Sequence, residues 1–224
     1  TVVFIAVVLA ALIYGCGSSD TDTADADRQY ETARADTSEL PLLEARLALR
    51  RAEFEKTAPD ALKQDFAIGI DKVRRSGILE TALNVGDVAP DFVLPSATGD
   101  TVRLSTLLKH GPVVLSWYRG GWCPYCNLEL AALREAVPHI ERLGATLVAI
   151  SPEQPDSALS TKEKHELPFA VLSDVGNRVG KQYGIVYRQA EEVNRHFEGR
   201  IDLEAYNGDD TFELPLPATY VVDT

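Results

Sequence analysis

Short apolar runs alternate with amphipathic segments through the second half of the chain. Runs typical of buried strands lie at residues 112–118, 145–150, 169–172 and 218–222, and segments with helical periodicity lie at 124–143, 154–166 and 174–183. A strand–turn–strand pattern over residues 86–105, with Thr98-Gly99-Asp100 at the turn, predicts a hairpin that ends at Ser105 as a helix N-cap. Because strands alternate with helices, we expect an α/β domain with parallel strands and right-handed crossovers.

Two segments with helical periodicity precede this domain. The recurring apolar residues are Leu40, Leu43, Leu47 and Phe54 in the first segment and Leu62, Phe66, Ile70 and Val73 in the second. Pro59 suits the first position of a helix, and Gly77 suits its end. The pattern predicts a two-helix extension that packs on the main domain.

An uncharged apolar run, residues 2–14, opens the chain and is followed by Gly15-Cys16. It is shorter than the roughly 20 residues that span a bilayer, and it suits the apolar part of a secretory signal. Ile13-Tyr14-Gly15-Cys16 is similar to a bacterial lipoprotein cleavage box, which predicts lipidation of Cys16; the alternative is an uncleaved membrane anchor. Both interpretations place the rest of the protein outside the cytoplasm, tethered to a membrane.

The predicted organisation follows from these patterns. Residues 1–16 are a lipoprotein-type signal or anchor, 17–37 a flexible linker rich in Ser, Thr, Asp and Ala, 38–84 the helical extension, and 85–224 the main domain. Within the main domain, residues 184–213 contain several turn-forming residues and are interpreted as an inserted surface loop. The chain has no Met and stops directly after a predicted strand, so we expect both termini to be incomplete.

Charge and cysteine content exclude several classes of protein. The chain has 34 Asp and Glu against 22 Lys and Arg, a formal net charge of −12, and no cluster of basic residues stands out. A nucleic-acid partner is therefore not expected, because phosphate binding needs clustered cations. Three cysteines are too few for a small scaffold held together by disulfides.

The candidate chemistry lies in Cys123-Pro124-Tyr125-Cys126, between a buried strand and a long helix. The free N–H groups and the dipole of a helix N-terminus stabilise an anion, so we expect Cys123 to be an accessible thiolate. Cys126 follows one turn later, at a spacing compatible with a disulfide, and we expect it to be more buried. Cys123 can therefore attack a substrate and Cys126 can resolve the product.

Two other interpretations of the cysteine pair remain. A zinc site would need about four Cys or His ligands, and the chain has no second CxxC; His110, His139, His165 and His196 are scattered. A structural disulfide would close too short a loop to stabilise the fold much. We expect neither a metal nor a cofactor.

The residues around the pair carry a family resemblance. Residues 117–130, WYRGGWCPYCNLEL, resemble the peroxiredoxin-like branch of the alkyl hydroperoxide reductase/thiol-specific antioxidant (AhpC/TSA) family, and residues 86–92 and 217–223 are similar to its entry segment and late strand. The resemblance covers residues 85–224. It implies a thioredoxin-like fold, a central mixed sheet flanked by helices, in which Pro217 is cis and faces the redox cysteines.

The sequence departs from the family pattern at three places. Typical peroxiredoxins carry Pro seven residues before the attacking cysteine and Thr or Ser three before it, where this chain has Ser116 and Gly120. The late Arg of the family has no clear match just before Pro217. Arg119 is expected either to replace that charge or to be a solvated loop arginine.

Two further residues near the pair have alternative interpretations. Trp122 is either a lid over the reactive sulfur or ordinary packing. Glu129 either lies beneath Cys126 and takes part in proton transfer or is an exposed helix residue.

The resemblance implies a thiol peroxidase that reduces hydrogen peroxide and organic hydroperoxides through Cys123 and Cys126 and is recycled by a thioredoxin-like electron donor. The alternative is a membrane-tethered thiol–disulfide oxidoreductase that acts on protein disulfides through the same pair, favoured by the missing hydroxyl at Gly120. A third possibility is a redox-inert binding module on a lipid tether.

Overall fold

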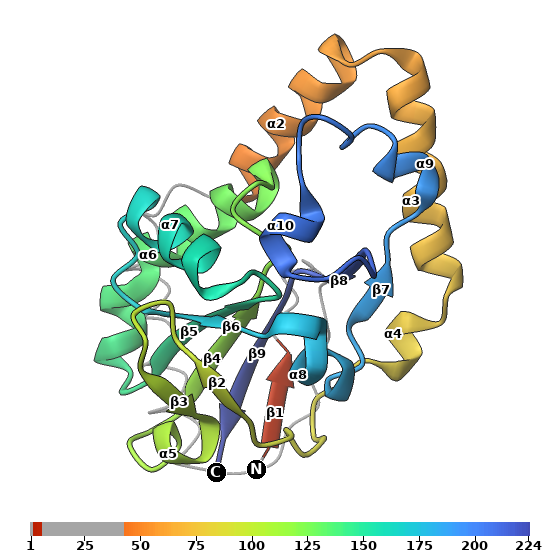
Figure 1. Ribbon diagram of the computed structural model, residues 1–224. Helices are drawn as coiled ribbons and strands as arrows, with labels where there is room; N and C mark the ends of the chain where they lie inside the picture. The colour runs from red at the N-terminus through yellow and green to blue at the C-terminus, as the bar shows by residue number, and fades with distance from the viewer. Residues whose placement is uncertain (1, 6–42) are drawn as a thin grey trace, which may run out of the picture.

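The computed structural model describes residues 2–5 and 43–224. At its centre is a five-stranded mixed sheet (Figure 1). The strand order is β1-β9-β4-β5-β6. The strands are β1 (Val2–Ile5), β4 (Val113–Trp117), β5 (Thr146–Ser151), β6 (Ala170–Ser173) and β9 (Ala218–Asp223). β4, β5 and β6 are parallel, and β9 runs antiparallel to both β4 and β1. The predicted strands and the α/β class are confirmed, with small shifts at the strand ends.

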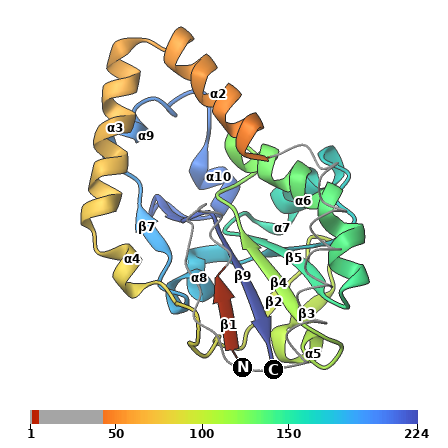
Figure 2. The same cartoon turned by 180° about the vertical axis from the view of Figure 1, so that it is seen from behind.

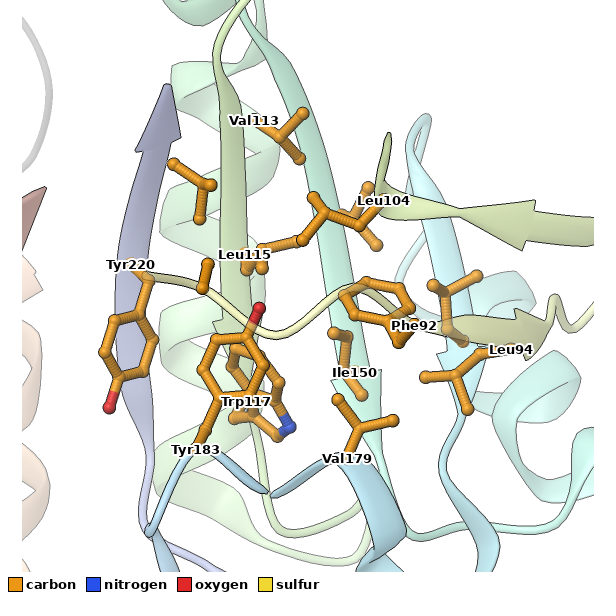
Figure 3. Packing of buried hydrophobic residues seen from close by; sticks show 14 of the residues in the cluster. Phe92, Leu94, Leu104, Val113, Leu115, Trp117, Ile150, Val179, Tyr183 and Tyr220 are labelled. Atoms are coloured by element: carbon orange, nitrogen blue, oxygen red, sulfur yellow. The ribbon is translucent and has the colours of Figure 1, made fainter. Parts of the chain in front are cut away.

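Helices cover both faces of this sheet, because alternate residues of its strands point to opposite sides. On one face, Leu147 and Ala149 of β5 pack with the helices α6 (Pro124–Arg142) and α7 (Pro155–Lys164). On the other face, Val148 and Ile150 join a core that includes α8 (Arg178–Gln182). Figure 3 shows this second core, in which the rings of Trp117, Tyr183 and Tyr220 pack against one another. The cysteine pair belongs to the first core.

The predicted hairpin is confirmed, but its end differs from the prediction. β2 (Val93–Pro95) and β3 (Thr101–Arg103) pair antiparallel, and the helix α5 (Leu104–Leu107) follows directly. The prediction of Ser105 as N-cap is wrong, because Ser105 lies inside this helix. Its N–H and hydroxyl donate instead to the Asp91 carboxylate, at 2.8 and 2.9 Å.

The two-helix extension forms as α2 (Leu43–Thr57) and α3 (Asp60–Arg75), followed by the short α4 (Ile78–Thr81). α2 meets α6 through the Arg46–Glu135 ion pair at 3.0 Å, and α3 lies beside the short helix α9 (Glu191–Asn194) (Figure 2). The predicted apolar face of α3 is not fully covered, since Ile70 is 52% exposed. The pair therefore contacts the domain at two places without forming a deep core of its own.

Residues 184–213 are not the plain surface loop that the sequence analysis predicted. They form β7 (Val186–Arg188), α9, α10 (Leu203–Asn207) and β8 (Glu213–Pro215), and β7 pairs antiparallel with β8. Their apolar side chains at Ile185, Val193 and Leu203 are buried, and so is Leu214 in the remainder of β8. These residues are too widely spaced for a periodic signal, so only packing against the rest of the chain reveals them.

The predicted helix over residues 174–183 is broken. A short 3₁₀ turn, Val175–Asn177, comes before α8, and Asn177 has a φ of 54° at the junction. The buried Asp174 carboxylate accepts the N–H groups of Val179 and Gly180 at 3.0 and 2.9 Å. These bonds satisfy free donors in the first turn of α8 and fix where the helix starts.

The predicted signal, its lipidated Cys16 and the 17–37 linker lie outside the described residues, apart from Val2–Ile5, which form the edge strand β1. These three interpretations stay predictions. Within the described ranges, no helix combines the length and apolar character needed to cross a bilayer.

Candidate active site

Cys123 occupies the N-cap position of α6, directly after the loop that leaves β4, and Pro124 follows at the first helical position. Proline fits there because it has no N–H to leave unpaired. Both cysteines are free thiols, and each is only 1% exposed. The expectation that Cys123 is accessible is therefore wrong for this conformation, and Cys126 is no more buried than Cys123. The reason is that residues from distant parts of the chain pack over the helix start.

The Cys123 sulfur lies in an environment that stabilises its charge. Hydrogen bonding from the Cys126 thiol, the nearby charge of Arg119 and the backbone N–H of Cys126 together lower the pKa of Cys123 to about 5, against the opposing effect of burial. The same thiol hydrogen bond and burial raise the pKa of Cys126 well above its usual range. At neutral pH the pair therefore consists of one thiolate and one thiol. The helix N-terminus contributes, as predicted, but two side chains contribute as well.

Arg119 is in direct contact with this thiolate. Its Nη2 donates to the Cys123 Sγ at 3.0 Å, and its guanidinium lies 5.8 Å from the centre of the Trp122 ring. The side chain is half-buried, and it also hydrogen-bonds Tyr187 of β7, so it is not a solvated loop arginine. The charge of the two cysteines and the Tyr187 bond raise the pKa of Arg119, although burial opposes them. Arg119 is thus a fixed cation beside the sulfur.

Trp122 packs over the loop before the cysteines. Its ring meets Phe197, which follows α9, with the ring centres 5.3 Å apart. The indole also lies against Gly120, where φ is +153° and an added Cβ would overlap the Trp122 Nε1. Glycine is required at this position for both reasons. Trp122 and Phe197 together form a cover contributed by two distant segments.

The carboxylate of Glu153 holds the loop from below, and the sequence analysis missed it. Glu153 is 0% exposed and accepts the Gly121 N–H and the Tyr118 hydroxyl, both at 2.9 Å, and the Thr161 hydroxyl at 3.4 Å. Burial raises the pKa of Glu153, while these hydrogen bonds lower it. One sequence signal could have found it. Glu153 comes just after a buried strand, β5, and β5 is the neighbour of β4, the strand that leads to the cysteines.

Gly121 is held through both of its backbone polar groups. Its N–H donates to Glu153, and its carbonyl accepts a hydrogen bond from the Asn127 side-chain amide at 2.9 Å. A Cβ at position 121 would overlap the Thr161 hydroxyl. The Gly120-Gly121 pair therefore lets the loop pass close to two side chains and presents Cys123 at one defined place.

Glu129 lies on α6, one turn after Cys126, and is half-buried. Burial and the negative charge of Cys123 raise its pKa to about 7. The interpretation as an exposed helix residue is therefore wrong. A proton-transfer role remains a prediction.

Pro217 is exposed and lies between β8 and β9. Its neighbour Ala218 pairs with Trp117, the last residue of β4. This segment therefore lies at the same end of the strands as the cysteine loop. The cis peptide bond and a role facing the cysteines stay predictions.

The arrangement supports two-electron thiol chemistry. A stabilised thiolate, a neighbouring neutral thiol and a fixed cation are the groups that oxidation of one sulfur and capture by the other require. In residues 43–224, no cluster of three or more His, Cys, Asp or Glu side chains is arranged to hold a metal ion.

Comparison with known proteins finds a family match over the part of the chain that contains the cysteine pair. The profile of the AhpC/TSA family matches residues 85–224. Chloroplastic peroxiredoxin Q from Populus jackii is 35% identical over 103 residues, which cover 46% of this chain and 48% of that protein. A putative peroxiredoxin bcp from Coxiella burnetii is 33% identical over 105 residues, covering 47% of this chain and 69% of that protein.

Among solved structures, peroxidoxin BcpB from Mycobacterium tuberculosis is similar, with 28% identity and a TM-score of 0.49 over 62% of this chain and 77% of that one. The chain spans about half the length of the first curated relatives it matches. The family profile covers well over half of this chain. The chain therefore belongs to the AhpC/TSA family.

Proposed function

We propose that the protein is a thiol peroxidase that reduces hydrogen peroxide and organic hydroperoxides through Cys123. The observation that carries the proposal is the Arg119 Nη2 contact at 3.0 Å on a Cys123 sulfur whose pKa is lowered to about 5. The thiolate is the nucleophilic form of cysteine, and at this pKa it is the main form at neutral pH. The relatives named peroxiredoxin support the same reaction class.

The proposed first step is attack of the Cys123 thiolate on the terminal oxygen of the hydroperoxide. A sulfur–oxygen bond forms, the oxygen–oxygen bond breaks, and the sulfur is oxidised by two electrons to a sulfenic acid. The other oxygen leaves with the bonding pair and takes up a proton to become an alcohol, or water when the substrate is hydrogen peroxide.

In the proposed second step, the Cys126 sulfur attacks the Cys123 sulfenic acid. A disulfide forms and water leaves with the Cys126 proton. A thioredoxin-like dithiol donor then supplies two electrons and two protons, which restores both thiols and leaves the donor as a disulfide.

Burial of Cys123 favours this reaction over the alternative, exchange with protein disulfides. The sulfur of a residue that is 1% exposed can be reached by a hydroperoxide through a smaller opening than another protein's disulfide needs. In the proposed peroxidase cycle, the larger opening is needed only when the donor reduces the Cys123–Cys126 disulfide. The same cysteines serve both reactions, so only the choice of substrate separates the two functions.

Stopped-flow mixing of the reduced protein with hydrogen peroxide or cumene hydroperoxide tests the proposal, with oxidation followed by tryptophan fluorescence. We expect oxidation much faster than that of free cysteine, its loss in Cys123→Ser, and a trapped sulfenic acid in Cys126→Ser. Oxidation at the rate of free cysteine, together with faster insulin reduction in excess dithiothreitol, would favour the disulfide-exchange alternative instead.

We further propose, from the N-terminal sequence alone, an extracytoplasmic location with a membrane tether at Cys16. Cell fractionation of the wild type beside Cys16→Ala tests this location. Equal distribution of both proteins between membrane and soluble fractions would contradict lipidation at Cys16.

A further inference from the structure

Two buried N–H donors in the loop before Cys123 have no hydrogen-bond acceptor among the residues that the structure describes. They are the Nε of Arg119 and the Nε1 of Trp122. Gly121, in the same loop, is hydrogen-bonded at both its polar atoms: Glu153 accepts the Gly121 N–H, and the Gly121 carbonyl accepts an amide from Asn127. The two unpaired donors therefore lie beside loop groups that have hydrogen-bond partners.

One donor belongs to the group that contacts the reacting sulfur, and the other belongs to the ring beside that group. The Nε of Arg119 is bonded to the same carbon as the Nη2 that contacts the Cys123 Sγ at 3.0 Å. The Trp122 ring lies 5.8 Å from that carbon, and its Nε1 edge rests on Gly120 in the loop before Cys123. Phe197 packs against the ring and holds it in this orientation.

Leaving these donors unpaired is costly. A buried donor without a partner destabilises the fold, so one is best explained where a ligand or a reaction uses it. Both groups donate and neither accepts, which makes a hydrogen-bond acceptor the complementary ligand. The oxygens of a hydroperoxide are acceptors, and the leaving oxygen becomes negatively charged as the oxygen–oxygen bond breaks.

We propose that the indole N–H of Trp122, together with the Nε–H of Arg119, binds the hydroperoxide oxygens and stabilises the charge on the leaving oxygen. Trp122 is then a catalytic residue and not only a cover over the sulfur. Trp122 donates a hydrogen bond and keeps its proton. The bonds formed and broken and the electrons transferred are therefore those of the proposed peroxidase step. This inference rests on that step. Donors fixed toward developing charge are among the strongest sources of rate acceleration.

Trp117 provides a comparison within the same chain. Its Nε1 is also buried without an acceptor in the described part of the structure, but its ring lies in the opposite core, against Tyr183 and Tyr220 (Figure 3). The chain has 2 Trp in all, so the two indole N–H signals are readily distinguished. A ligand at the Cys123 site should affect Trp122 and leave Trp117 unchanged.

The first test is Trp122→Phe, which removes the N–H but keeps an aromatic ring for Arg119 and Phe197. Phe197→Leu is the matched control, because it weakens the packing and keeps the indole. Each reduced protein is mixed with hydrogen peroxide and, separately, with iodoacetamide, whose leaving group is iodide and not oxygen.

We expect Trp122→Phe to slow oxidation by hydrogen peroxide about 10- to 100-fold, because removing one such donor typically costs a factor of this order or more. Alkylation by iodoacetamide should stay within about twofold of the wild type, and Phe197→Leu should change both rates by a common factor. Unchanged oxidation in Trp122→Phe would overturn the inference. Equal slowing of oxidation and alkylation in this variant would also overturn it, because Trp122 would then act through access alone.

A second measurement does not depend on how the Trp122 variant folds. Cys123→Ser protein labelled with ¹⁵N is titrated with tert-butyl hydroperoxide, and the two indole N–H resonances are followed. A shift of the Trp122 resonance with Trp117 unchanged is expected; no shift, or an equal shift of both, contradicts the site. If the wild type reacts no faster than free cysteine, the proposed function fails and this inference with it, whereas a fast wild type and an equally fast Trp122→Phe overturn the inference alone.

Discussion

Replacing Arg119 with Gln should make Cys123 a much weaker acid. The change removes the positive charge and the hydrogen bond that reaches the sulfur at 3.0 Å, while a side chain of similar length stays in the loop. The Cys126 thiol and the N–H of the first helical turn still contact Cys123. The lowering of the pKa should therefore be reduced but not abolished.

The size of the effect follows from the contact. A hydrogen bond to a charged group contributes about 1.5–3 kcal/mol, and one pKa unit corresponds to about 1.36 kcal/mol, which gives a rise of about one to two units. The pKa of Cys123, about 5 in the wild type, should thus increase to roughly 6–7 in the variant. At pH 5.5 the thiolate fraction should fall from roughly three quarters to a quarter or less.

The ultraviolet absorbance of the thiolate, recorded against pH on the reduced protein, measures this change. The pH dependence of iodoacetamide alkylation provides an independent value for the same titration. Because the pKa of Cys126 is raised, its titration occurs at higher pH and is separated from that of Cys123. Arg134→Gln is the matched control: Arg134 lies on the same helix α6 but donates to the His165 carbonyl, away from the sulfur.

An Arg119→Gln titration that coincides with the wild type would refute the reasoning, since it would mean that the guanidinium does not stabilise the thiolate. An equal shift in Arg134→Gln would also count against it, because the effect would then come from net charge and not from the contact. At high pH, where Cys123 is fully ionised in all three proteins, alkylation should be faster in Arg119→Gln than in the other two, because a thiolate of higher pKa is the stronger nucleophile.

Three further variants test other parts of the site. Cys126→Ala should raise the pKa of Cys123, because the thiol hydrogen bond is the largest cause of the lowered pKa. The peroxide-treated variant should also react with dimedone. An unchanged thiolate titration would contradict this prediction. Gly121→Ala should destabilise the fold by about 1–3 kcal/mol in urea unfolding, since the new methyl overlaps the Thr161 hydroxyl. Adding Thr161→Ala should recover part of this loss. Additive effects of the two substitutions in the double variant would argue against the overlap. Glu129 has a pKa raised from 4.5 to about 7, so its favourable contribution is complete below pH 4.5 and is lost as the pH rises through 7. Glu129→Gln should therefore stabilise the fold by about 3 kcal/mol more at pH 8 than at pH 4, and a difference independent of pH would refute the burial argument.

Local physical rules were sufficient to predict the framework of the domain. Strand and helix positions follow from apolar periodicity, and the start of α6 at Cys123-Pro124 follows from the preferences of a helix N-terminus. These signals act between residues close together in the chain, so they are enough to predict the α/β order and the position of the cysteine pair at a helix start. The same reasoning failed for residues 184–213, because their apolar residues pack on distant elements and carry no local period.

The properties of the sulfur itself were decided by tertiary structure. Cys123 is buried in a core cluster whose members come from several distant segments, and its loop is held by Glu153, which lies beyond the next strand. From its position in the sequence, the Arg119 side chain could either extend into solvent or contact the Cys123 sulfur. Only the folded loop shows that it contacts the sulfur. A pKa depends on desolvation and on charges a few ångströms away, and folding brings those neighbours together from positions that the sequence does not relate.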